Sequence, residues 1–249
     1  MTAIALSGVA KTFRRGPQVT RALDPIDLAI GAGEFVAIVG PSGCGKSTLL
    51  SILGGLLRPS DGRAELRGAP PAGSHNPLTF VFQDFALLPW CTVEANVEFP
   101  LVHTALDAAA RRAVVDDALR RTGLTDFRAA YPKQLSGGMR QRVGIARALA
   151  VRPAILLMDE PLSALDSQTR ELLMEDFIRL LADGAMGAVY VTHNLEEAVR
   201  LADRIVVLSR RPGRVREIVD IPMTRAERGA IDARGKLLAL QNDLWSLIR

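Results

Sequence analysis

Cysteine and long apolar runs are both scarce in this chain of 249 residues. The two cysteines, Cys44 and Cys91, cannot build a disulfide framework, which fits a reducing cytosol. No apolar run approaches the roughly 18–20 residues that a membrane-spanning helix needs. The N-terminus has no charged head followed by an apolar stretch and a cleavage site, so we expect no export signal. The composition, 48% hydrophobic and 23% charged, excludes a disordered, collagen-like or coiled-coil protein.

Positive charge is concentrated toward the C-terminal end. The net charge is +4, and the residues from Arg204 onward include 10 basic and 5 acidic side chains. Such a segment could face nucleic acid or an anionic membrane surface, or it could be a solvated arginine-rich face. Nucleic acid is the weakest of these interpretations, because the arginines are not interleaved with aromatic residues at stacking spacing. We therefore expect no nucleic-acid partner.

Short apolar runs alternate with helix-length segments, which predicts an α/β fold with a largely parallel sheet. The candidate strands are 35–39, 155–158, 188–191 and 205–208. A helix is expected from about Lys46, with one side made of Leu49, Leu50, Leu53, Leu56 and Leu57. A second helix is expected after Pro161, and Gly184 is well placed to end it. Its core face would hold Leu173, Phe177, Leu180 and Leu181.

The middle of the chain differs, because strand signals fade after Leu87 and helical patterns dominate to Leu149. Asp107 can cap a helix that carries Val114, Ala118 and Leu119 at helical spacing, with Gly123 just past its end. We interpret this region as a helical subdomain inserted into the α/β core.

The last stretch, residues 231–248, could form an amphipathic helix, although Gly235 weakens that prediction. Its apolar face would hold Leu237, Leu244, Trp245 and Ile248. Packing on the core is the default role, with subunit or regulatory contacts as the alternative. We thus expect a single domain over 1–249, with an α/β core (1–86 and 152–215), a helical subdomain (87–151) and a C-terminal extension (216–249).

A glycine-rich turn, GPSGCGKST, lies between a predicted strand and a predicted helix and fits the phosphate-binding pattern G-x-x-x-x-G-K-[ST]. Its glycines let backbone N–H groups surround a polyanion at a helix N-terminus. Lys46 would reach the β- and γ-phosphates, and the Ser47 hydroxyl would hold Mg²⁺. The alternative is a flexible glycine turn. The expected nucleotide-binding residues of this loop are Gly40, Pro41, Ser42, Gly43, Cys44, Gly45, Lys46, Ser47 and Thr48.

Two adjacent carboxylates, Asp159 and Glu160, end the apolar run AILLM. Neighbours on an extended backbone point in opposite directions, so the two can serve different tasks. Asp159 would bind Mg²⁺, directly or through water, and Glu160 would polarise the attacking water. A helix-capping or surface pair is the alternative, but a phosphate-binding loop in the same chain favours catalysis.

The run LSGGMRQR is more specific than either nucleotide motif. Its Ser136 precedes a predicted helix, so the hydroxyl and the N–H groups of Gly137 and Gly138 would form a second anion-receptive terminus. With this motif, residues 1–215 resemble the ATP-binding cassette (ABC) ATPases, and their motifs follow one another in the order typical of that family. The resemblance implies a P-loop NTPase core with an inserted helical subdomain and an N-terminal antiparallel β region. It also implies a homodimer, in which the serine-glycine motif of one chain closes over ATP held by the other.

The resemblance assigns further roles to single residues. Gln83 would sense Mg²⁺ and the attacking water, Asp166 would cross the dimer interface, and His193 would contact the γ-phosphate. Phe13 would stack on adenine, where the family usually has tyrosine. His193 could instead be a structural histidine and Phe13 a core residue. Two further departures, Asn194 and Leu162, remove no group that touches phosphate or metal.

Within this family, one cassette without membrane spans, coiled coil or long regulatory domain indicates an ATPase subunit that docks on a separate permease. The segments 85–97 and 208–215 resemble ATP-binding subunits of nitrate, sulfonate and taurine importers. Trp90 would then enter a groove for the permease, or it would belong to the subdomain core. The implied partners are an integral membrane permease and, indirectly, a solute-binding protein, with the chain on the cytoplasmic face of the bacterial inner membrane. Alternatives are an iron–sulfur-type assembly factor and a metabolic kinase.

Overall fold

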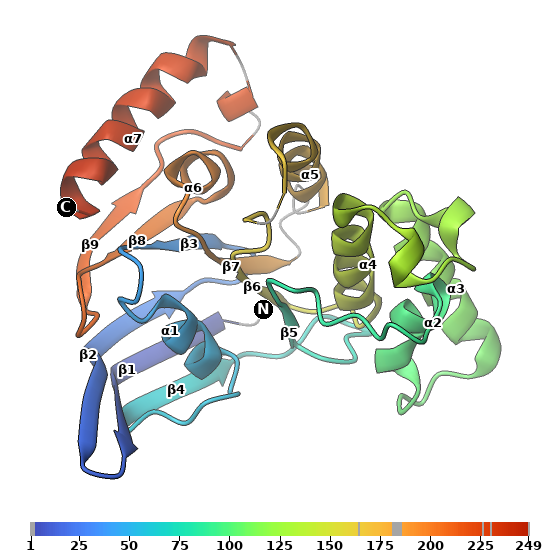
Figure 1. The fold of residues 1–249 in the computed structure, drawn as a ribbon, viewed down its shortest axis with the longest axis horizontal. Helices are drawn as coiled ribbons and strands as arrows, with labels where there is room; N and C mark the ends of the chain where they lie inside the picture. The colour runs from blue at the N-terminus through green and yellow to red at the C-terminus, as the bar shows by residue number, and fades with distance from the viewer. Residues whose placement is uncertain (1–2, 164, 181–185, 226, 230, 249) are drawn as a thin grey trace.

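The computed structural model describes residues 3–163, 165–180, 186–225, 227–229 and 231–248. A six-stranded sheet lies at its centre, in the order β5-β6-β7-β3-β8-β9 (Figure 1). All neighbours in this sheet pair in parallel except β8 and β9, which are antiparallel. Its strands are β3 (Phe35–Val39), β5 (Leu78–Val81), β6 (Ile155–Asp159), β7 (Gly187–Val191), β8 (Arg204–Leu208) and β9 (Val215–Asp220). The four strands predicted from apolar runs are thus β3, β6, β7 and β8.

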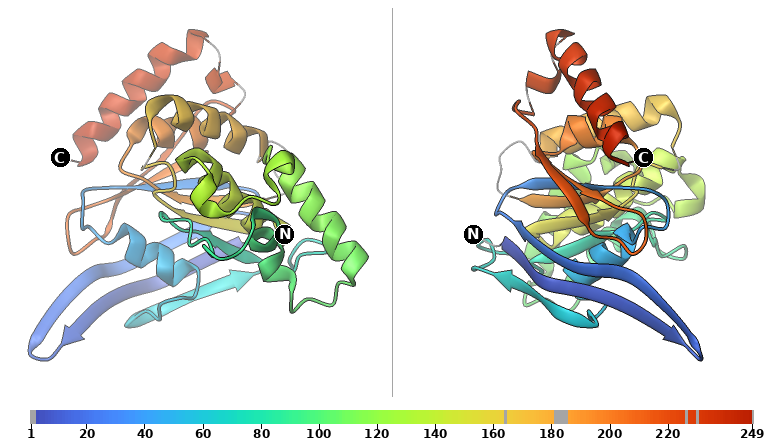
Figure 2. Two further views of the ribbon diagram at one scale, coloured as in Figure 1. Left: turned by 45° about the vertical axis from the view of Figure 1, so that its right-hand side comes forward. Right: turned by 90° about the vertical axis from the view of Figure 1, so that its left-hand side faces the viewer.

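A three-stranded antiparallel sheet in the order β2-β1-β4 packs beside the first one. Figure 2 shows its long hairpin reaching away from the rest of the molecule. Its strands are β1 (Ala3–Arg15), β2 (Gln18–Ile30) and β4 (Asp61–Arg67). The resemblance predicted this region, whereas no apolar run identified its strands.

Strand β3 is buried along its whole length, because both faces of the central sheet are covered. Phe35, Ala37 and Val39 point into a cluster that includes residues of α5 (Ser167–Leu180), α6 (Leu195–Leu201) and α7 (Arg234–Ile248). Val36 and Ile38 point into a second cluster, with residues of α1 (Lys46–Leu53) and the antiparallel sheet. A parallel strand covered on both faces has an almost uninterrupted apolar sequence, which is why these strands are easily recognised.

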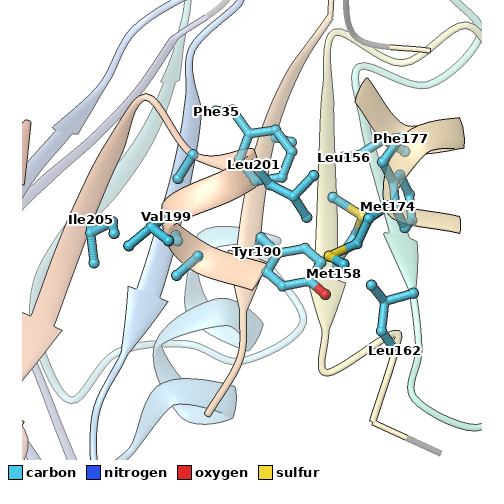
Figure 3. Packing of buried hydrophobic residues seen from close by; sticks show 14 of the residues in the cluster. Phe35, Leu156, Met158, Leu162, Met174, Phe177, Tyr190, Val199, Leu201 and Ile205 are labelled. Atoms are coloured by element: carbon cyan, nitrogen blue, oxygen red, sulfur yellow. The ribbon is translucent and has the colours of Figure 1, made fainter. Parts of the chain in front are cut away.

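Three aromatic rings lie among the aliphatic and methionine side chains of the first of these clusters (Figure 3). Tyr190 on β7 lies between Phe35 and Phe177, with ring centroids 5.9 and 6.5 Å away. Phe177 and Leu173 hold α5 on the sheet, as predicted. The predicted end of this helix falls outside the described residues, since nothing is described of residues 181–185 or of the side chain of Leu180.

Helix α1 follows the phosphate-binding loop and buries Leu49, Leu50 and Leu53 under the sheet. It ends earlier than the leucine pattern predicted, at Leu53, because Gly54 and Gly55 interrupt it. Leu56 lies beyond this end and is exposed, so its predicted place on the leucine side of the helix was wrong.

Helices α2 (Val93–Glu98), α3 (Ala108–Arg121) and α4 (Gly137–Ala150) form a lobe at one side of the sheet (Figure 1). The lobe has an apolar cluster of its own, which includes Leu101, Leu119 and Val143. Asp107 caps α3 as predicted: its Oδ1 accepts a hydrogen bond from the Ala110 N–H at 2.8 Å. Short 3₁₀ helices lie at Phe99–Leu101, Thr125–Phe127, Pro132–Gln134, Glu227–Gly229 and Ile231–Ala233.

The C-terminal helix α7 packs on the core through Leu237 and Leu244, which are both buried. It starts at Arg234, after a 3₁₀ turn, so it is shorter than the predicted 231–248. Trp245 is half exposed, at 50%, and was wrongly placed on the buried face. No helix among the described residues combines the length and the hydropathy needed to cross a membrane.

Candidate functional site

The phosphate-binding loop connects the end of β3 to the first residue of α1, Lys46. Gly45 occupies the N-cap position with φ = 107°, where other residues are strained. A Cβ at this position would also lie 2.6 Å from the Leu23 side chain. No side chain caps α1, so its first N–H groups are available to an anion.

Lys46 is 7% exposed, and its ammonium is held by the loop itself. Its Nζ donates to the carbonyl oxygens of Gly40 at 2.9 Å and Pro41 at 3.2 Å. Neutral carbonyls leave the positive charge uncompensated, which favours binding of a phosphate at this point.

Ser47 joins the loop to the end of β6, because its Oγ donates to Asp159 Oδ1 at 3.1 Å. Burial raises the pKa of Asp159, and the charge of Glu160 adds to this rise, while the Ser47 hydrogen bond and Lys46 oppose it. A hydroxyl and a carboxylate oxygen are the donor types that Mg²⁺ prefers. The described residues contain no cluster of three or more His, Cys, Asp or Glu side chains for a metal. The pair therefore fits a Mg²⁺ ion that is completed by nucleotide phosphates and water.

Glu160 does not share the Ser47 contact of Asp159, and its side chain faces His193. Its Oε2 lies 3.0 Å from His193 Nδ1, and its backbone N–H donates to the Val191 carbonyl at 2.9 Å. Glu160 has φ = 45°, an uncommon conformation for a residue with a side chain. Such strained residues cluster at functional sites, where surrounding contacts hold them in place.

Gln83, just after β5, reaches the same region through Ser163. Its Nε2 donates to Ser163 Oγ at 3.2 Å, and Ser163 Oγ donates to the Glu160 carbonyl at 2.9 Å. The structure thus connects Gln83 and His193 to Glu160, although the three residues come from different strand ends.

A cavity of about 310 Å³ lies over the phosphate-binding loop. Phe13 on β1 lines it and is 42% exposed, so Phe13 is no core residue. Lys11 Nζ lies 5.2 Å from the Phe13 ring centroid. An aromatic ring at one end and a phosphate-binding loop at the other match the two ends of a nucleotide. The cavity is lined by Phe13, Thr20, Ala22, Ser42, Gly43, Gly45, Lys46, Ser47, Thr48, Glu160 and Arg211.

The serine-glycine motif lies outside this cavity. Ser136 caps α4, where its Oγ accepts from the Met139 N–H at 3.3 Å, and none of Ser136, Gly137 and Gly138 lines the cavity. Asp166 is also outside, where it accepts from the Thr169 N–H at 3.0 Å at the start of α5. A Cβ on Gly138 would lie 2.5 Å from the Thr169 side chain, so the two helix starts are in contact. The predicted site residues therefore form two groups within one chain.

Three polar residues that the sequence analysis missed, two buried and one half-buried, connect the segments that carry the site. Gln141 on α4 is fully buried, and its Nε2 donates to the Pro161 carbonyl at 2.6 Å. Arg147 on the same helix donates to the carbonyls of Phe85 and Ala86, and burial lowers its pKa. Glu197 is 3% exposed and follows His193 on α6. Polar residues on the buried faces of amphipathic helices were the only available sequence signal.

Comparisons with known proteins agree with this geometry. A family model described as "ABC transporter" matches residues 23–163. The taurine import ATP-binding protein TauB of Burkholderia pseudomallei is 46% identical over 83% of this chain and 79% of its own length. The bicarbonate transport ATP-binding protein CmpD of a Synechocystis species is 39% identical over 89% of this chain and 80% of its own. The solved dimer of the ATP-binding cassette MJ0796 with ADP and phosphate has a TM-score of 0.77 and 36% identity, covering 89% of this chain and 100% of its own.

The fold and the cavity define a phosphate-loop ATPase with an attached helical lobe. The chain belongs to the ABC transporter family, and its relatives make it an ATPase of that family.

Proposed function

We propose that the chain is the ATP-hydrolysing subunit of an importer, acting as a homodimer beneath a separate membrane permease. The observation that carries this proposal is the division of the site, since Ser136 and Asp166 lie outside the cavity that holds Lys46 and Glu160. A second copy in head-to-tail orientation would bring its Ser136 motif to that cavity. The related cassette MJ0796 is itself described as a dimer with ADP and phosphate.

The residues in and beside the cavity have separate tasks in this proposal. The loop N–H groups and Lys46 bind the phosphates, and Phe13 supports the adenine ring. Glu160 accepts a proton from the attacking water as the γ-phosphate is transferred, and His193 orients Glu160 through their 3.0 Å contact. Positioning and charge stabilisation supply most of the catalysis of phosphoryl transfer.

Ser47 and Asp159 are the residues that would hold Mg²⁺. Gln83 follows β5, which pairs with the strand that ends at Asp159. The ion would neutralise charge on the β- and γ-phosphates when bound. Without it, the chain's own contribution is to keep the Ser47 hydroxyl, which lines the cavity, 3.1 Å from the Asp159 carboxylate.

An exposed apolar group on the helical lobe would receive the permease. Trp90 is 73% exposed, so the alternative that it belongs to the lobe's core is wrong. Pro89 beside it is exposed, while Leu87 packs inward against the lobe. Exposed aromatic residues of this kind concentrate binding energy at interfaces. The chain would thus be held at the cytoplasmic face of the membrane by its partner.

Trp90→Ala should weaken binding to the permease and the stimulation of ATPase activity by transport, with little effect on ATP affinity. The measurements are co-purification of a membrane permease with the chain and transport-stimulated hydrolysis in vesicles. Trp245→Ala is the matched control, since Trp245 is half exposed on α7, away from the lobe. Unchanged co-purification and stimulation in Trp90→Ala would refute this docking site.

The proposed solute is a small anion or zwitterion of the sulfonate, taurine or nitrate type. Two relatives are named for taurine and bicarbonate, which belong to the same range of small charged solutes. Growth of a deletion strain on taurine or another sulfonate as the sulfur source, or on nitrate as the nitrogen source, tests this class. Normal growth on all of them, together with normal bicarbonate uptake, would exclude it. The names of these relatives do not favour an assembly factor of the iron–sulfur type.

A further inference from the structure

Arg211 is a basic residue that lines the cavity, although no sequence motif for phosphate chemistry includes it. It lies in the loop 209–214, which connects β8 to β9 and is far in sequence from the phosphate-binding loop. The cavity contains one other basic side chain, Lys46, and one carboxylate, Glu160.

The loop that carries Arg211 is fixed to both walls of the cavity. The Gly213 N–H donates to the Ala22 carbonyl at 2.9 Å, and the Asp24 N–H donates to the Gly213 carbonyl at 2.9 Å. A Cβ on Gly213 would lie 2.1 Å from the Cys44 carbonyl, so the loop touches the phosphate-binding turn as closely as a backbone can. These contacts hold the loop at the junction between β2 and the phosphate-binding loop.

Inside the loop, the hydroxyl of Ser209 ties its two ends together. Ser209 Oγ donates to the Arg210 carbonyl at 3.0 Å and accepts from the Arg214 N–H at 3.2 Å. Arg211 is exposed, and no carboxylate of the described residues pairs with it within 4 Å. Its guanidinium is therefore held near the cavity with its donors free for a ligand.

We propose that Arg211 binds the α-phosphate of the nucleotide. This inference rests on the nucleotide site proposed above. A nucleotide with its base against Phe13 and its terminal phosphates on Lys46 passes Ala22, beside which Gly213 anchors the loop. The group of the nucleotide at that midpoint is the ribose and its α-phosphate. A guanidinium matches phosphate oxygens with two parallel hydrogen bonds, so it suits this position better than a lysine would.

The test measures binding of ATP and of ADP, each with Mg²⁺, by calorimetry on the full chain. Arg211→Ala should raise the Kd of both nucleotides about tenfold or more, because both carry the α-phosphate. Arg211→Lys should recover part of the loss, since it keeps the charge without the planar fork. Arg210→Ala is the matched control, an exposed neighbour in the same loop that does not line the cavity, and it should stay within about twofold of the parent chain.

Three results would overturn the proposal: an Arg211→Ala chain that binds both nucleotides like its parent, a loss confined to ATP, and an equal loss in Arg210→Ala. A loss confined to ATP would place the guanidinium at the γ-phosphate. Failure of the site itself is recognised separately, through Lys46→Ala. If the parent chain and Lys46→Ala bind ATP equally, the proposed nucleotide site is wrong. If Lys46→Ala loses ATP affinity while Arg211→Ala binds ATP and ADP like the parent chain, only this inference is refuted.

Discussion

Asp159 and Glu160 are adjacent in the chain, yet their surroundings assign them different partners. Asp159 is the last residue of β6, still paired with β7, and its carboxylate accepts a hydrogen bond from Ser47. Glu160 has φ = 45°, and its side chain contacts His193. The alternation of side chains on an extended strand was enough to predict that the two carboxylates separate. The left-handed backbone of Glu160 could not be predicted, because it depends on the contact of its N–H with β7.

Replacing Glu160 by glutamine should abolish most hydrolysis while ATP still binds. The amide keeps the size of the side chain but cannot accept a proton, so turnover should fall about 10²- to 10⁴-fold. Phosphate release and ATP affinity measured on the purified variant check both parts. Glu196→Gln, an exposed change on α6, serves as the control and should keep the parent rate. Parent-like turnover in the Glu160→Gln chain would remove Glu160 from its proposed role.

At the scale of single residues, motif positions were predictable and their connections were not. The sequence identified Gln83 and His193 through the resemblance, but Ser163, which joins Gln83 to the Glu160 backbone, was not distinguished from any other loop serine. Such bridges depend on how separate strand ends approach each other in space.

At the scale of secondary structure, the buried carboxylate of Glu197 links the loop that carries His193 to the loop that carries Asp166. Glu197 Oε2 on α6 accepts hydrogen bonds from Tyr190 at 2.7 Å and from Thr192 at 2.8 Å, just before His193. Its other oxygen lies 3.6 Å from Arg170, which donates to the Leu165 carbonyl next to Asp166. The loop with His193 and the loop with Asp166 are therefore joined by hydrogen bonds and one ion pair.

Removing the Tyr190 hydroxyl should destabilise the protein by about 1–2 kcal/mol, because a buried carboxylate loses one of its donors. Burial, together with the adjacent Glu197, raises the pKa of Tyr190 well above its ordinary value, so the phenol remains a donor at ordinary pH. Tyr190→Phe should therefore lower Tm by roughly 4 °C.

Tyr131→Phe is the natural comparison for this change. Tyr131 is the only other tyrosine in the chain and is 41% exposed, so its variant should stay within about 0.5 kcal/mol of the parent. Equal stability of the two variants in thermal and urea unfolding would show that the Glu197 network contributes nothing.

Helix and strand predictions succeeded where burial is two-sided and failed at the ends of elements. Strands such as β3 are covered on both faces, so composition alone marks them. Leucine spacing could not show that α1 stops at Leu53 or that Trp245 faces solvent, because glycines and neighbouring elements decide both. The strands β1, β2 and β4 have mixed polar sequences, so only the resemblance to a family indicated an antiparallel sheet.

At the scale of the whole molecule, α4 connects the helical lobe to the nucleotide cavity. Its half-buried Arg147 donates to the carbonyls of Phe85 and Ala86, and a Cβ added to Gly144 would lie 3.3 Å from the Phe85 side chain. Gln83 lies two residues before Phe85, and Trp90 follows shortly after Ala86. The segment that would contact a permease is thus tied to the same helix whose N-terminus carries Ser136. Sequence motifs and the resemblance indicated Gln83, Trp90 and Ser136 separately, but only the fold shows that α4 joins them through Arg147.

The division of the site into two groups predicts that ATP joins two chains. Glu160→Gln, which holds ATP without hydrolysing it, should elute as a dimer with ATP and as a monomer without it. Adding Ser136→Arg should abolish the dimer and leave the ATP affinity of the single chain unchanged, because Ser136 does not line the cavity. Ser246→Arg on the exposed side of α7 controls for the added charge and should still dimerise. Size-exclusion chromatography with light scattering distinguishes these states, and hydrolysis per chain should fall on dilution of the parent protein. A Glu160→Gln/Ser136→Arg chain that still dimerises, or a rate per chain that does not change with dilution, would mean that one copy holds a complete site.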